Sequence, residues 1–135
     1  MGDRAEHPLA AGQVVTVFRS RLRPDVIDEY EPRAAEMFAL AHTMPGLVDV
    51  KSFTADDGER VTLVTFADAE SQRAWREHPD HRLAQQAGRD RFYAEYSIQV
   101  CECTRVRTFT STSGSGRDAP VVGASGPDGG QPAVG

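Results

Sequence analysis

The order of the strand-like and helix-like patterns is the feature that most limits how this chain can fold. Alternating β-branched and aromatic residues predict strands over residues 13–22, 47–54, 60–67 and 95–108. Helical spacing of apolar residues predicts one helix between the first two strands and another between the last two. The order β-α-β-β-α-β is that of the ferredoxin-like unit. The sequence therefore predicts an α+β fold: a four-stranded antiparallel sheet with two helices on one face.

The first helix is predicted over residues 26–43, and its unusual residue is Pro32. A proline inside a helix removes one backbone hydrogen bond and clashes with the preceding turn. We therefore expect either a kink at Pro32 or a main helix that begins near Glu31. Met44-Pro45-Gly46 ends the helix.

The segment from Asp68 to Tyr96 carries the side chains most suited to a binding site. Asp68 is a good N-cap for a second helix. The helix is interrupted at His78-Pro79, and Pro79 can begin a further helix that runs to Gly88. The segment holds the only tryptophan, two of the four histidines and two of the three tyrosines: Trp75, His78, His81, Tyr93 and Tyr96.

The two ends of the chain differ in composition from its middle. Residues 1–12 contain Pro8, Gly12 and mixed charges, and predict a flexible N-terminal arm. Residues 110–135 are rich in Gly, Ser and Pro and bury too little apolar surface to offset the entropy of ordering. We expect a disordered C-terminal tail there, and one folded domain over residues 13–109.

Charge and hydropathy argue against several classes of partner. The net charge is −5, so the basic surface of a nucleic-acid binder is not expected. No apolar run approaches the roughly 18 residues of a membrane span, and the first ten residues lack a signal-peptide core. We expect a cytoplasmic protein. The only cysteines, Cys101 and Cys103, suit neither an unstrained disulfide nor, without further ligands, a metal site.

Apolar residues in the predicted strands supply both faces of the sheet, whereas the helices cover only one. An uncovered apolar sheet face implies a partner. We therefore expect a homodimer in which two sheets pack face to face. The residues that alternate in this way are Val15, Val17, Val61, Leu63, Ile98 and Val100.

Two stretches of the chain resemble a known family. They are MPGLVDVKSFTADDGERVTLVTFAD, residues 44–68, and AWREHPDHRLAQQAGRDRFYAEYSIQVCE, residues 74–102. Both resemble the antibiotic biosynthesis monooxygenase domain family, and the resemblance covers about residues 13–109. It implies a ferredoxin-like fold assembled as a dimeric α/β barrel. Members of the family oxidise polycyclic aromatic substrates without metal or flavin, degrade haem, or have no known activity, so the fold alone does not assign the reaction.

The cofactor-independent branch implies a small or polycyclic phenol- or anthrone-like substrate, O2, and no cofactor or metal. A deprotonated phenol or anthrone can donate an electron directly to O2, so the protein supplies a dry pocket, a base and oxyanion donors. Histidine is the natural base near neutral pH. The candidate catalytic residues are His78, His81 and Arg19. The candidate substrate-binding residues are Trp75, Phe92, Tyr93, Tyr96 and Arg89.

Two other functions remain open at this point. The haem-degrading branch shares Trp75, but its haem-ligating histidine would fall at Gln85 or Gln86 and its first-strand asparagine near Ser20. One of three expected positions is therefore present, and haem is the alternative cofactor. The third function is a non-catalytic dimeric module that binds a small molecule.

Each candidate residue also has a purely structural interpretation. Trp75 on an amphipathic helix is often a core residue, and His78 before a proline is often a helix-end residue. His81 fits a surface or dimer edge, and Arg89 fits a solvated charge cluster. Arg19 is the exception, because between valine-bearing positions it would face a buried surface and need a partner.

Overall fold

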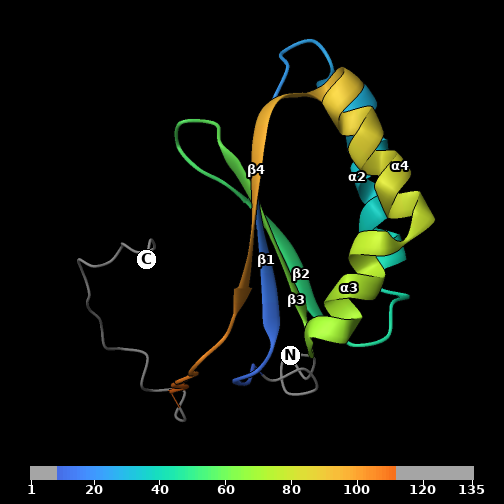
Figure 1. Ribbon diagram of the computed structural model, residues 1–135. Helices are drawn as coiled ribbons and strands as arrows, with labels where there is room; N and C mark the ends of the chain where they lie inside the picture. Colours follow the sequence, from blue (N-terminus) through green and yellow to red (C-terminus); the bar gives the residue numbers. More distant parts are fainter. Residues whose placement is uncertain (1–8, 112–135) are drawn as a thin grey trace.

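A four-stranded antiparallel sheet of order β2-β3-β1-β4 is covered on one face by helices in the computed structural model, which describes residues 9–111 (Figure 1). The expected ferredoxin-like fold is confirmed. The predicted N-terminal arm and C-terminal tail fall mainly on residues 1–8 and 112–135, which lie outside the described residues. The elements are β1 (Val14–Leu22), α2 (Ile27–Ala41), β2 (Leu47–Thr54), β3 (Arg60–Phe66), α3 (Ala69–Glu77), α4 (Pro79–Ala87), a π-helical turn η1 (Gly88–Phe92) and β4 (Tyr93–Glu102).

The strand register separates the two faces of the sheet. Val17 in β1 lies opposite Leu63 in β3 and Gln99 in β4. Because side chains alternate along a strand, this set points away from the helices, while Phe18 and Ile98 point toward them. The uncovered face carries Val15, Val17, Val61 and Leu63, so part of the predicted apolar set is confirmed there. Ile98 and Val100 instead face the helix layer, and the dimer stays a prediction.

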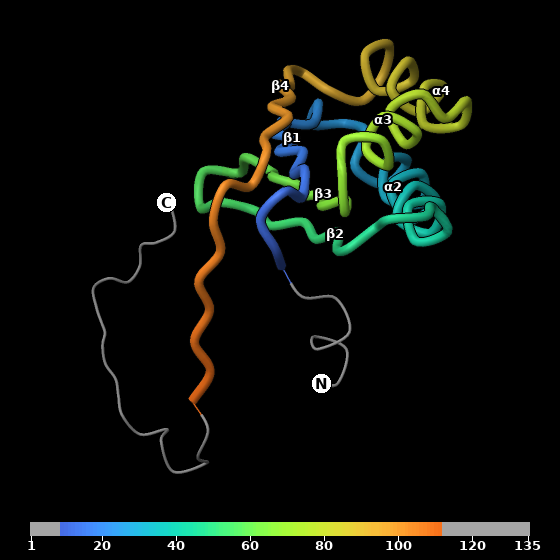
Figure 2. Tube along the Cα trace, turned by 60° about the horizontal axis from the view of Figure 1, so that its bottom comes forward, coloured from blue at the N-terminus to red at the C-terminus, as the bar shows by residue number. Residues whose placement is uncertain are grey.

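The last strand is shorter than predicted at its C-terminal end. The prediction of a strand through residue 108 is wrong, because β4 pairs with β1, and Val14 at the start of β1 lies opposite Glu102. The final contacts are the Gly12 amide to the Cys103 carbonyl and the Cys103 amide to the Gln13 carbonyl, each at 2.8 Å. Residues 104–111 have no neighbouring strand in the described chain. They run away from the domain as an extended segment (Figure 2).

Helix α2 continues through Pro32, so the prediction of a main helix starting near Glu31 is wrong. Pro32 has no N–H group to donate to the carbonyl of Asp28, so α2 lacks one backbone hydrogen bond. The helix nevertheless begins at Ile27 and runs through Pro32 without a break. Its C-terminal half packs on the core through Ala41, which is 1% exposed. Tertiary packing of that face, rather than local propensity, stabilises the helix.

The break between α3 and α4 is built as the sequence predicts. The Asp68 carboxylate accepts a hydrogen bond from the Ser71 amide at 2.8 Å and caps α3. His78 is extended, with ψ of 131°, and its Nδ1 accepts from the Asp80 amide at 3.1 Å. Pro79 is the first residue of α4, where its missing N–H costs no helical bond. The chain therefore turns sharply and brings the start of α4 back beside the end of α3.

Candidate active site between the helices and the sheet

A cavity of about 200 Å³ lies between the helix layer and the sheet. Its walls come from all four strands and the helices, and are mostly apolar. A cavity of about 150 Å³ holds a benzene ring, so this one accommodates a ligand of one or two rings. Ile98 and Val100 line it and are 41% and 51% exposed, which places them at an open mouth through which a larger ligand could extend.

Trp75 and His81 line the cavity as a stacked pair. The rings stack at a centroid distance of 4.2 Å and an angle of 28°, because the break at Pro79 folds α4 back on α3. Trp75 is 6% exposed and also contacts Phe66, the fully buried core residue, at 6.4 Å between ring centroids. The pair therefore joins the hydrophobic core to the cavity wall.

His81 is a neutral imidazole in this setting. Burial is the main cause that lowers its pKa below the ordinary value, and it outweighs the backbone carbonyls of Arg76 and Trp75, which raise it. Its Nδ1 is buried and has no hydrogen-bond partner in the part of the chain that the structure describes. The backbone carbonyls of Arg76 and Trp75 lie close to the ring, so the imidazole has polar neighbours even though Nδ1 makes no hydrogen bond of good geometry. A neutral imidazole at pH 7 can accept a proton.

Three tyrosines that contact one another also line the cavity. The hydroxyls of Tyr30 and Tyr93 are 3.0 Å apart, and the Tyr93 ring meets Phe18 edge-on at 5.3 Å and Tyr96 at 5.7 Å. Burial is the main cause that raises the pKa of Tyr93 far above its usual range, and the Tyr30 hydroxyl adds to the shift. Tyr93 is therefore protonated at neutral pH and can act as a hydrogen-bond donor.

A polar group completes the lining on α3. Gln72, which is 5% exposed, donates from Nε2 to Thr16 Oγ1 at 3.4 Å and accepts at Oε1 from Arg76 Nη1 at 3.2 Å. All three line the cavity. Our sequence reasoning missed Gln72 and Arg76. The available signal was the spacing from Gln72, because Trp75 and Arg76 follow it at i+3 and i+4 and these positions share one helix face.

The structure brings five of the eight predicted site residues to the cavity. His78 is not one of them, since it caps α4. Arg89 is exposed outside the cavity and reaches only the Tyr96 hydroxyl, at 3.4 Å, with Gln86 Oε1 accepting from it at 2.7 Å. The five that line the cavity are His81, Trp75, Phe92, Tyr93 and Tyr96.

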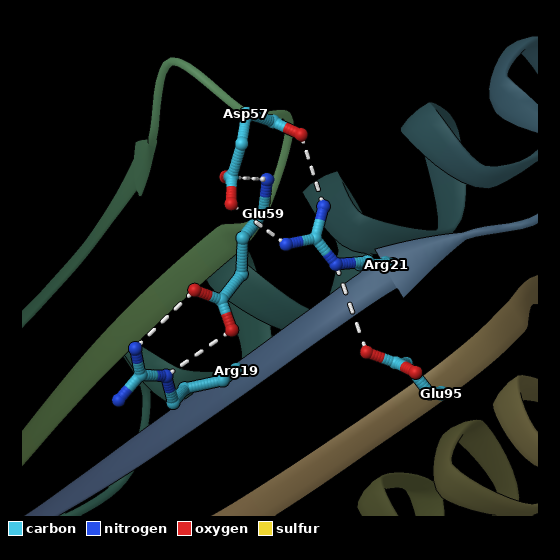
Figure 3. Close-up of polar contacts among 5 residues, drawn as sticks. All are labelled: Arg19, Arg21, Asp57, Glu59 and Glu95. Carbon is cyan, nitrogen blue, oxygen red and sulfur yellow. Dashed lines mark hydrogen bonds and ion pairs between the residues drawn. The ribbon is translucent and has the colours of Figure 1, made fainter.

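Arg19 lies on the opposite face of the sheet. Its side chain is 49% exposed and pairs with Glu59 at 3.2 Å, so the expected buried environment is absent in the single chain (Figure 3). Beside it, Arg21 binds Asp57 at 2.9 Å and approaches Glu95 at 3.6 Å. These ion pairs border the uncovered apolar face and do not contribute to the cavity.

Haem does not fit the residues present. Gln85 lines the cavity near the place where the resemblance puts a haem-ligating histidine. Ser20 stands near the place of the expected first-strand asparagine, so Trp75 alone of the three expected positions carries the matching residue. Within residues 9–111, no group of three or more His, Cys, Asp or Glu side chains is arranged to hold a metal ion, and no helix is long and apolar enough to cross a membrane.

Comparisons with known proteins agree with this fold. The family model described as antibiotic biosynthesis monooxygenase matches residues 13–87. YqjZ, an uncharacterized protein of Bacillus subtilis (strain 168), is 31% identical over 80 residues, which are 59% of this chain and 70% of YqjZ.

Solved structures are similar in fold at low identity. SnoaB, a cofactor-independent oxygenase from Streptomyces nogalater, matches with a TM-score of 0.61 and 18% identity, over 71% of this chain and 97% of SnoaB. A conserved protein from Methanosarcina mazei Go1 matches with a TM-score of 0.62 and 11% identity, over 68% of this chain and 93% of that one. At such identities, the likeness concerns the fold alone.

Proposed function

Since this chain belongs to the antibiotic biosynthesis monooxygenase family, we propose that it is a cofactor-independent monooxygenase acting on a phenol- or anthrone-type aromatic substrate with O2. The observation that carries the proposal is the stacked pair of Trp75 and neutral His81 in an apolar cavity. The similarity in fold to SnoaB, a cofactor-independent oxygenase, supports it. The cavity accommodates one or two rings, and a third ring would extend through the mouth.

The reaction begins with proton transfer to His81. The substrate ring lies in the cavity beside the stacked Trp75–His81 pair, with its acidic O–H or C–H bond toward the imidazole, which takes the proton. The resulting anion gives one electron to O2, and the radical and superoxide combine into a peroxide. The peroxide then loses water and leaves a carbonyl. In a methylene substrate, the methylene group and one O2 become one carbonyl group and one water, so the substrate supplies all four electrons.

Tyr93 is the proposed oxyanion donor. Its hydroxyl stays protonated because burial raises its pKa, and the Tyr30 hydroxyl lies 3.0 Å away. With substrate bound, Tyr30 can donate to the Tyr93 oxygen while Tyr93 donates to the developing oxyanion. A positioned donor of this kind acts strongly in a cavity that excludes water.

We also propose that the functional unit is a homodimer formed through the uncovered sheet face. That face presents four aliphatic side chains together with Phe53, which is 48% exposed. An apolar sheet face bordered by charged residues is typical of a protein interface. The aliphatic residues are Val15, Val17, Val61 and Leu63.

Histidine replacements test the catalytic assignment. O2 uptake is measured with anthrone as the probe, on protein dialysed against a chelator. His81→Ala should lower the rate by about 10²- to 10⁴-fold, the usual loss for a general base. His78→Asn is the matched control: it lies outside the cavity and keeps a side-chain oxygen for the α4 cap, so its rate should change little. Equal tolerance of both replacements would refute the assignment to His81.

A further inference from the structure

The charge of the cavity lining opposes the charge of the chain. The chain has 20 acidic against 15 basic residues, a net charge of −5. The lining nevertheless includes Arg33 and Arg76, while no Asp or Glu is found among the described residues that line it. The neutral His81 adds no charge. Arginines facing an apolar cavity make its interior attractive to anions, because field lines are focused between low-dielectric walls.

Arg76 is the better placed of the two arginines. Arg33 lies near Glu36 on its own helix, at 4.0 Å, and its guanidinium carbon lies 6.0 Å from the centre of the Phe92 ring. Within the described chain, Arg76 has no carboxylate within 4.0 Å and makes one side-chain hydrogen bond, to Gln72 Oε1 at 3.2 Å. A guanidinium has five N–H donors, so the remaining donors of Arg76 are available to a ligand.

Gln72 holds Arg76 at the cavity. Its side chain is buried and bridges from Thr16 on β1 to Arg76 on α3. Arg76 itself is exposed, so its guanidinium stands at the mouth rather than in the deepest part. Trp75 and Arg76 both line the cavity from α3, so the cavity offers an aromatic side chain and a cation to the same ligand.

We infer that the ligand of this cavity is an aromatic carboxylate whose ring packs on Trp75 and whose carboxylate binds Arg76. The inference rests on the proposed function for the aromatic part of the ligand and adds the acidic group. A carboxylate matches the planar fork of a guanidinium with two parallel hydrogen bonds, and it is ionised at neutral pH. The substrate class is therefore a hydroxylated or anthrone-type aromatic acid.

Two isosteric probes test the inference by binding alone. Isothermal titration calorimetry would compare 2-naphthoate with 2-naphthamide, which has the same shape but no charge. Charge-assisted hydrogen bonds of this kind correspond to about tenfold or more in affinity, so wild-type protein should prefer naphthoate by that factor. The preference should shrink at high salt, because the mouth is open to solvent. Equal binding of the two probes by wild-type protein would overturn the inference.

Variants on α3 locate the preference. Arg76→Gln should bring naphthoate affinity down to that of naphthamide and leave naphthamide affinity unchanged. Arg73→Gln is the matched control, since Arg73 is an exposed arginine of the same helix outside the cavity lining, and its preference should equal that of wild type. Arg76→Lys should keep part of the preference, because it keeps the charge and loses the fork. An equal loss in the Arg76→Gln and Arg73→Gln variants would also overturn the inference.

The outcome is separable from that of the oxygenase proposal. Neither naphthalene probe carries a hydroxyl or a reactive methylene, so their binding does not depend on turnover. An Arg76-dependent preference in a protein that consumes no O2 would refute the oxygenase and keep the aromatic-acid site. O2 consumption with neutral anthrone, together with no preference for naphthoate, would keep the oxygenase proposal and refute the aromatic-acid site.

Discussion

Replacing Tyr93 or Tyr30 with Phe should separate stability from catalysis, because both changes remove the same hydrogen bond. The hydroxyls are 3.0 Å apart, and the contact between them is partly buried. A net hydrogen bond contributes about 1 kcal/mol to the free energy of unfolding. For a domain of roughly 100 residues this corresponds to a loss of about 4–8 °C in Tm for either variant. The double variant should lose less than the sum, since the bond is broken only once.

The two variants should differ in rate. If Tyr93 donates to the oxyanion, Tyr93→Phe should lower kcat by about 10²- to 10³-fold, the effect of removing one such donor. Tyr30→Phe removes the hydrogen bond that orients the Tyr93 hydroxyl but leaves that donor in place, so kcat should fall by less than about tenfold. Thermal denaturation gives the first comparison, and O2 uptake with anthrone gives the second. Equal Tm losses accompanied by equal rate losses would refute the assignment of the donor to Tyr93.

Three further predictions concern assembly, pH and the π-helical turn. Sedimentation at micromolar concentration should show a homodimer, and a monomer would contradict the proposed sheet-face interface. Burial lowers the pKa of His81, so the folded protein keeps a neutral imidazole down to a pH below about 6.5, the ordinary histidine value, and kcat/KM should fall only below that pH. The unfolded chain takes up its proton near pH 6.5, so the free energy of unfolding should also decline as the pH falls from there. A decrease of kcat/KM centred above pH 6.5 would contradict this. Gly88→Ala should lower the free energy of unfolding by about 1–3 kcal/mol in chemical denaturation, because the new Cβ would lie 2.5 Å from Tyr93 Cε2 and force the ring to move. An unchanged denaturation midpoint would contradict this and show that the Tyr93 ring is free to shift.

The sequence predicted the elements well because each one is specified locally. Turn and cap residues such as Asp68, Pro79 and Gly58 determine their own backbone geometry, and the structure has them in the expected roles. The last strand was predicted too long because the end of a strand depends on its neighbour. The alternation after Cys103 continues in sequence, but β1 offers no further partner.

The site residues could be predicted from the sequence where helical spacing determines which side chains share a face. Trp75 and His81 came from their place around the Pro79 break. Gln72 and Arg76 could have been found from the helix period, because Gln72 lies three residues before Trp75 and four before Arg76. Arg19 shows the limit of this reasoning. Alternation correctly places it on one face with Val17, but it does not say which face the helices cover. That choice depends on the chain crossovers, which the local pattern does not contain.

Isotope labelling tests the central claim most directly. Chelator-treated, dialysed protein would be incubated with anthrone under ¹⁸O2, and the product analysed by mass spectrometry. The proposed mechanism predicts one ¹⁸O atom in the product carbonyl, one O2 consumed per substrate, and loss of both in the His81→Ala variant. A carbonyl oxygen that comes from water, or a rate that returns only when haem, flavin or metal is added, would contradict a cofactor-independent oxygenase.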